Sequence, residues 1–143
     1  MSGRGWKCST GEITTGTSAL QIFKLTAASN HRVYVKKIDV SFKGIVVTDA
    51  PIKVRLLKAT DAGTFTSLTL VDDGVADAET IQTTAGHTAT VACTLTDLYD
   101  SGEVHPQTAR RFGPFWIAGG ARLVVEVTAG VSTSVIVSAA GEE

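Results

Sequence analysis

The sequence contains few of the residues on which disulfides, metal sites and catalysis depend. Its 143 residues include two cysteines, three histidines and three prolines, and aromatic residues make up only 6%. Cys8 and Cys93 do not form a CxxC pair, so we expect two buried or half-buried free thiols in a reducing cytoplasm. A chain of this length buries enough apolar surface to fold without a disulfide or a metal ion.

The sequence also lacks long apolar runs. Stretches such as 123–125 and 135–137 are far shorter than the roughly 20 apolar residues that a membrane-spanning helix needs. The positive charges near the N-terminus are not followed by an apolar stretch, so we expect no secretory signal. We therefore expect a protein that is made in the cytoplasm and does not contact a membrane.

The net charge is close to zero, but the charges are unevenly distributed along the chain. Thirteen basic and 14 acidic residues give a net charge of −1, which argues against nucleic-acid binding by bulk charge. Residues 1–58 hold ten Lys or Arg and three acids, whereas residues 59–109 hold eight acids and no Lys or Arg. Two interpretations stay open. Either strands from the two blocks interleave, or the surface is dipolar and docks on another copy or on a complementary protein.

The dipolar interpretation supplies candidate contact residues. The basic candidates are Lys36, Lys37, Lys53 and Arg55, and the acidic candidates are Asp72 and Asp73. These two aspartates begin the acidic segment 72–79, which does not match the EF-hand spacing. We expect this segment to be a solvated loop rather than a calcium site.

The spacing of apolar residues predicts strands and almost no helix. Thr and Val are abundant, and apolar residues alternate with polar ones in the segments 34–42, 52–56 and 123–127 and again in 134–139. A further segment places Val91, Cys93, Leu95 and Asp97 on one face. This alternation is typical of half-buried strands in antiparallel sheets.

Turn residues divide the chain at regular intervals. Seven breaks are expected, at residues 29–31, 61–63, 72–74, 85–87, 100–102, 118–120 and 129–130. Seven breaks predict about eight strands in one domain, so we expect an all-β, antiparallel β-sandwich or jelly roll over residues 18–143.

The first 17 residues have a different composition, with alternating Gly, Ser and Thr and few apolar residues. We expect them to form an extended N-terminal arm, either flexible, or an edge strand, or ordered only against a partner. Trp6 has no obvious local core, so we interpret it as an anchor of the arm on a partner, with Arg4 and Lys7 beside it.

The sequence contains no recognisable catalytic constellation. His31, His87 and His105 are not spaced as metal ligands, and GxSxG, GxxxxGK[ST] and strand-linked GxGxxG motifs are missing. Phe115 and Trp116 are interpreted as core packing rather than as a sugar-stacking platform. We therefore predict no enzyme activity, no catalytic or metal-binding residues and no cofactor.

Several stretches resemble small β-sandwich structural proteins of tailed phages and prophages. The resemblance lies in residues 103–107, 112–115 and 118–123, together with 37–44 and 54–57, and spans about residues 33–140. It implies a virion protein, most like a capsid decoration (cement) protein. Such a protein is made in the host cytoplasm and binds the outer surface of the phage head through the major capsid protein. The resemblance also implies a homo-oligomer, with a trimer favoured.

Two other classes of function remain as alternatives. A head- or tail-fibre domain would bind a host-surface glycan or receptor, with Trp116 or Tyr99 lining a groove. A cupin-like enzyme would bring the three histidines together around a metal ion.

Overall fold

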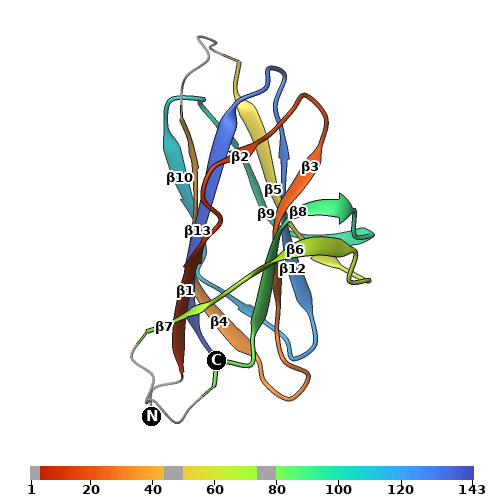
Figure 1. Ribbon diagram of the computed structural model, residues 1–143, viewed down its shortest axis with the longest axis vertical. Coiled ribbons are helices and arrows are strands. Elements are labelled where there is room, and N and C mark those ends of the chain that lie inside the picture. Colours follow the sequence, from red (N-terminus) through yellow and green to blue (C-terminus); the bar gives the residue numbers. More distant parts are fainter. Residues whose placement is uncertain (1–3, 44–49, 74–79) are drawn as a thin grey trace.

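The computed structural model describes residues 4–43, 50–73 and 80–143, which form two antiparallel sheets and contain no helix (Figure 1). The seven-stranded sheet has the order β10 (Ala109–Phe112), β4 (Val33–Phe42), β13 (Ser134–Glu142), β1 (Gly5–Ser9), β7 (Val71–Asp72); in addition β11 (Phe115–Ile117) pairs with β4 and β2 (Ile13–Thr14) pairs with β13. The six-stranded sheet has the order β6 (Thr64–Leu68), β8 (Thr84–Val91), β3 (Leu20–Thr26), β12 (Arg122–Thr128), β5 (Ile52–Ala59), β9 (Leu95–Val104). The expected all-β sandwich is confirmed.

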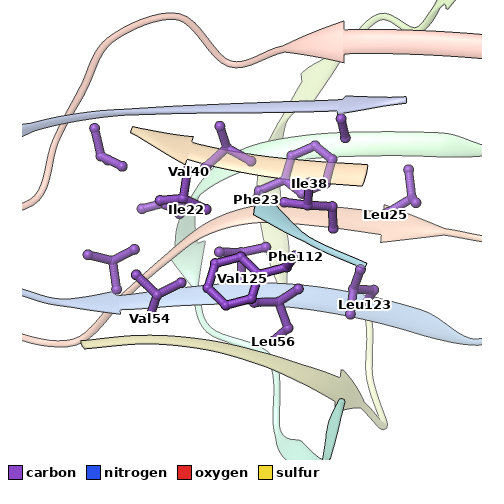
Figure 2. Close-up of a cluster of buried hydrophobic side chains, with 14 of the residues drawn as sticks. Ile22, Phe23, Leu25, Ile38, Val40, Val54, Leu56, Phe112, Leu123 and Val125 are labelled. Carbon is purple, nitrogen blue, oxygen red and sulfur yellow. The ribbon is translucent and has the colours of Figure 1, made fainter. Parts of the chain in front are cut away.

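The core lies between the two sheets and follows the predicted alternation. On β13, Val135, Val137 and Ala139 are buried, and the residues between them are half-buried on the outer side. Figure 2 shows side chains of β3, β5 and β12 facing those of β4, with Phe112 of β10 among them. Burying branched aliphatic side chains in this layer supplies the main driving force for folding, at about 25 cal/mol per Å² of apolar surface.

Two register shifts adjust which side chains reach the core. The β3–β12 pairing shifts between Val125 and Glu126, and both Ile22 and Phe23 of β3 are fully buried. The β4–β13 pairing shifts between Ala140 and Gly141, and Lys36 and Lys37 of β4 both reach the outer surface. Each shift is a β-bulge, which re-aims neighbouring side chains.

The N-terminal segment differs from the expected arm. Gly5–Ser9 forms β1, which lies inside the seven-stranded sheet between β13 and β7, and Trp6 is fully buried in the core. The interpretation of Trp6 as an anchor on a partner is therefore wrong. The local sequence gives no sign of this pairing, because the partner strand β13 lies about 130 residues away along the chain.

The strand count also differs from the expected eight, since the described residues form thirteen strands. Two predicted breaks are wrong, because β8 continues through 85–87 and β9 continues through 100–102. Gly86 allows close packing instead of a turn: a Cβ there would lie 2.7 Å from Cβ of Phe65. Conversely, the predicted strand through Val91 and Asp97 is interrupted, since residues 92–94 link β8 to β9 and Val91 is exposed.

Within the described residues, no helix has the length and hydropathy required to cross a membrane.

Candidate functional site

The sandwich mixes the two charge blocks that are separate in the sequence. Lys53 on β5, from the basic block, lies opposite Glu103 on β9, from the acidic block, and β1 and β3 of the basic block pair with β7 and β8 of the acidic block. Nε of Arg55 donates a hydrogen bond of 3.0 Å to Oε1 of Glu126, a carboxylate outside both blocks. Lys36 forms an ion pair of 3.1 Å with Glu142. Strand pairing thus follows the interleaving interpretation. Among the predicted basic contacts, Lys36 and Lys37 lie on one sheet and Lys53 and Arg55 on the other.

The outer surface of the seven-stranded sheet brings two of the predicted lysines together. We call this surface the seven-stranded face; its outward side chains include Lys7, Tyr34, Lys36, Lys37, Asp39, Trp116, Ser138, Ala140 and Glu142. Lys7 and Lys37 lie on either side of Ala140, in register across β1, β13 and β4. They line a hollow of about 370 Å³ whose lining also includes Ser138 and the exposed Val71.

Ion pairs fix several charged groups on this face. Asp39 accepts a hydrogen bond of 2.8 Å from Nε of Arg111 and forms an ion pair of 3.5 Å with Lys37. The hydrogen bond from Arg111 lowers the pKa of Asp39 below its usual value, and the nearby positive charges of Arg111 and Lys37 lower it further. Asp39 therefore stays ionised at neutral pH and neutralises part of the basic surface.

An exposed aromatic cluster lies at the edge of the seven-stranded face. Trp116 on β11 is 53% exposed, and its ring centroid lies 4.8 Å from that of Tyr34 on β4. The guanidinium carbon of Arg32 lies 4.3 Å from the centroid of the Trp116 ring. The interpretation of Trp116 as core packing is therefore wrong, because Ile117, not Trp116, points into the core from β11. Phe115 is half-buried and stacks on Tyr99.

The outer surface of the six-stranded sheet, which we call the six-stranded face, has its own small apolar cluster. Ala59, Cys93 and Val124 are buried there, with Phe65 and Leu95 packed against them. Cys93, in the link 92–94 between β8 and β9, packs against Val124 and covers it. The buried Gln21 side chain bonds both the N–H and the C=O of Cys93, at 2.7 and 2.9 Å. Leu98 on β9 lies opposite Leu57 and is 54% exposed. Lys53 and Arg55 belong to this face.

Arg4 joins segments from both ends of the chain. Its Nε lies 3.4 Å from Oε1 of Glu143, its Nη1 donates to the carbonyl of Thr80 at 2.9 Å, and its Nη2 lies 3.3 Å from Nε2 of His31. The Glu143 carboxylate also accepts hydrogen bonds from the backbone N–H groups of Gln82 and Thr83. Arg4 thus has a structural role within the chain.

The two predicted acidic contacts lie at the edge of the seven-stranded sheet. Asp72 on β7 is paired with Trp6, and the Asp73 N–H donates to the Gly5 carbonyl at 2.9 Å. The rest of the acidic segment, residues 74–79, lies outside the described residues.

The histidines do not form a metal centre in the described part of the chain. No group of three or more His, Cys, Asp or Glu side chains there is arranged to hold a metal ion. His31 contacts Arg4, His87 lies 3.0 Å from Oγ1 of Thr88, and Nδ1 of His105 accepts from the Gln107 N–H. The cupin-like alternative required these residues to converge, and it is not supported.

Both cysteines are free and buried, as the sequence predicted. Burial raises the pKa of the Cys8 thiol to about 11, although a backbone hydrogen bond at Ala139 partly opposes this shift. Burial also raises the pKa of Cys93. Neither thiol is activated as a nucleophile.

Sequence reasoning missed the aromatic cluster and the cover over Val124. Arg32, Tyr34 and Lys36 alternate along the chain, and this period-two spacing was a signal that they share a face. The pairing of Trp116 with Tyr34 and of Gln21 with Cys93 gives no local signal, because each pair is more than 70 residues apart.

Comparisons with protein-family models, with curated proteins and with solved structures found no significant match to this chain.

Proposed function

We propose that this chain is a capsid decoration protein, a structural component that binds the outer surface of an assembled phage head. Its partner would be the major capsid protein, and we propose a homotrimer with jelly-roll topology as its state on the head. The proposal comes from the sequence resemblance, and one structural observation carries it further. That observation is the exposed apolar side chain of Leu98 on the six-stranded face, which also carries charged side chains further along β5 and β9.

Leu98 lies at the end of a continuous apolar row. Leu98, Leu57 and Val124 are in register across β9, β5 and β12, and the last two are buried. Nearby on the same face are Lys53 opposite Glu103 and the pair formed by Arg55 and Glu126. An apolar centre within a charged rim is the usual arrangement of a protein–protein interface.

The segment that leads into β9 is held in place before any partner binds. Besides the two hydrogen bonds from Gln21 to Cys93, the Thr60 N–H donates to the Thr94 carbonyl at 2.9 Å. The Thr94 N–H donates to Oδ1 of Asp61 at 3.1 Å. A surface that is ordered in the free protein loses little conformational entropy on binding, and this increases affinity.

The proposed mechanism is physical rather than chemical. Each copy would bury Leu98 and its charged rim against the capsid surface, and a trimer would multiply these contacts. Because linked sites bind with avidity, modest single contacts add to strong attachment. Binding to the assembled state stabilises that state against disassembly.

The test is a binding assay on bare phage heads with matched surface variants. Purified wild-type protein is expected to bind heads stoichiometrically in sedimentation and electron microscopy, on the outer surface. Leu98→Asp should weaken binding roughly tenfold or more, since it places a charge at the apolar centre. Val71→Asp is the matched control, because Val71 is 55% exposed on the opposite face; it should bind like the wild type.

Each other outcome has a defined meaning. Absence of stoichiometric binding by the wild type would contradict the decoration function. Loss of binding by Val71→Asp but not by Leu98→Asp would show that the seven-stranded face docks instead. Light scattering after size-exclusion chromatography tests the trimer separately.

A further inference from the structure

We propose that the seven-stranded face binds an oligosaccharide that carries a carboxylate group. Trp116 would stack on one sugar ring, and the hollow between Lys7 and Lys37 would hold the carboxylate of a nearby sugar unit. This inference goes beyond attachment to a phage head and does not depend on it. Its residues lie on the face opposite to Leu98.

Trp116 is an ordered indole that Tyr34 and Arg32 cover only in part. It is 53% exposed although Tyr34 and Arg32 both contact it. Tyr34 lies on the ten-residue strand β4 in register with Trp116, and the two rings are inclined at 42°, so Tyr34 holds the indole in place. A large, exposed and immobilised indole is a frequent mark of a binding site. The C–H groups on one face of a pyranose ring suit such a surface.

Hydrogen-bonding groups lie next to the platform. Glu142 on β13 is in register with Tyr34, and its Oε1 lies 3.1 Å from Nζ of Lys36. The side chains of Lys36 and Glu142 are 49% and 33% exposed. They therefore offer a donor and an acceptor to sugar hydroxyl groups. An aromatic ring with a mixed polar rim fits a carbohydrate better than a purely apolar ligand.

The hollow between Lys7 and Lys37 lies further along β13 from Glu142. Ala140 lies two residues from Glu142 on the same face, about 7 Å along the strand. Lys7 and Lys37 flank Ala140, and the hollow of about 370 Å³ lies above the strand. A chain of a few sugar units on Trp116 would reach it.

Charge on this face favours an acidic sugar. Asp39 already interacts with Arg111 and Lys37, and Glu142 already interacts with Lys36. Lys7 and Arg32 add positive charge to a surface whose described carboxylates are thus neutralised. An incoming carboxylate would therefore meet net positive charge, and ion pairing would add to the stacking energy.

The same geometry fits a single-stranded nucleic acid less well. Binding of single strands uses a series of stacking platforms along a basic groove. Trp116 and Tyr34 contact each other and together offer one stacking position.

The experiment titrates the purified full chain with defined probes. Three acidic oligosaccharides (hyaluronan, oligogalacturonate and oligosialate), neutral cello-oligosaccharide and oligothymidylate are compared by calorimetry and tryptophan fluorescence. We expect at least one acidic probe to bind roughly fivefold or more tightly than the neutral one, and oligothymidylate to bind more weakly than both.

Variants test separately the stacking position at Trp116 and the hollow between Lys7 and Lys37. Trp116→Ala should weaken all sugar binding roughly tenfold, and Trp116→Phe should keep part of it. Lys7→Ala with Lys37→Ala should reduce the affinity for the acidic probe to that of the neutral probe. Lys58→Ala is the matched control, because this exposed lysine belongs to β5 of the other sheet. Thermal melting checks that every variant is folded.

Four outcomes would overturn the proposal: no sugar binding at millimolar concentration, equal affinity for acidic and neutral probes, tighter binding of oligothymidylate, or unchanged binding by Trp116→Ala. Because no phage head is present in this assay, its result is separate from the test of decoration.

Discussion

Trp6 lies directly opposite Gly141 across β1 and β13, and its indole occupies the space that a side chain at Gly141 would need. A Cβ at Gly141 would lie 2.6 Å from Cζ2 of Trp6 and still closer to the Tyr34 carbonyl oxygen. The largest buried side chain of the protein is thus accommodated by the absence of one on the neighbouring strand. This pair joins the two ends of the chain in one sheet.

Substitutions at this pair should destabilise the whole domain. Trp6→Ala is expected to lower the free energy of unfolding by about 3–5 kcal/mol, because it leaves a cavity in the core. Gly141→Ala should cost about 1–3 kcal/mol, since the new methyl group collides with backbone and indole atoms. Urea unfolding followed by circular dichroism measures both changes.

Two variants act as controls for this prediction. Gly130→Ala should change stability little, because the space around that position is open. Trp6→Phe should cost less than Trp6→Ala, since it keeps most of the apolar volume and removes an indole N–H that has no hydrogen-bond partner among the described residues. Wild-type stability in Trp6→Ala would mean that β1 contributes nothing to the fold, as expected of a flexible arm.

The sequence predicted those features that depend on short-range alternation. Strands β4, β5, β12 and β13 were expected from their period-two spacing, and their inward residues, such as Ile38 and Val125, are buried. The burial of Val124 could not be predicted from the sequence, because the alternation assigns this residue to the solvent side of the sheet. It is buried on that side by Ala59, Phe65, Cys93 and Leu95, all of them distant in the sequence.

The candidate site was less predictable for the same reason. Lys7 and Lys37 were candidates on charge alone, but only strand register places them on either side of Ala140. Trp116 was misassigned, because an aromatic residue within an apolar stretch is more often buried than exposed. The sequence predicts a turn at Gly86, but the role of this glycine is to let Phe65 pack closely. Non-local packing decides each of these cases.

The Glu143 carboxylate should make stability depend on pH. Its side chain is fully buried. Burial alone raises its pKa, but hydrogen bonds from the Thr83 side chain and from the N–H groups of Gln82 and Thr83, together with the charge of Arg4, lower it below the usual 4.5. The ionised form is therefore favoured in the folded state. The resulting stabilisation is present above pH 4.5 and is lost as the pH falls through the folded-state pKa.

Glu143→Gln isolates this contribution. At pH 7 the variant should be about 2 kcal/mol less stable than the wild type, because charge-assisted hydrogen bonds are lost. The difference should shrink as the pH falls well below 4.5. Chemical unfolding at several pH values measures it, and Glu103→Gln, at an exposed position on β9, should show no such difference. A constant gap between wild type and Glu143→Gln at all pH values would contradict the assignment.

The thiol of Cys8 should react slowly in the folded protein. Its pKa of about 11, against an ordinary value of 9.0, lowers the reactive thiolate fraction roughly a hundredfold, and the side chain is only 7% exposed. In Cys93→Ala, which leaves Cys8 as the sole thiol, labelling by a disulfide reagent at pH 8 should be slow in buffer and fast in concentrated urea. Rapid labelling in buffer would show that β1 separates readily from β13.

Gln21 should hold residues 92–94 in place on the outer surface of the six-stranded sheet. Its amide Nε2 donates to the Cys93 carbonyl and its Oε1 accepts from the Cys93 N–H, so one side chain satisfies both backbone groups of a buried residue. Gln21→Leu keeps a similar volume but leaves both groups without a partner, at an expected cost of about 2–3 kcal/mol. Hydrogen exchange at residues 92–94 should accelerate more than in the core strands, because the link is local.

Gln82→Leu is the control, since that side chain is exposed and its residue bonds Glu143 through the backbone N–H. Unchanged exchange in Gln21→Leu would show that packing of Cys93 on Val124 alone holds the cover, and that Gln21 does not order the segment leading to Leu98.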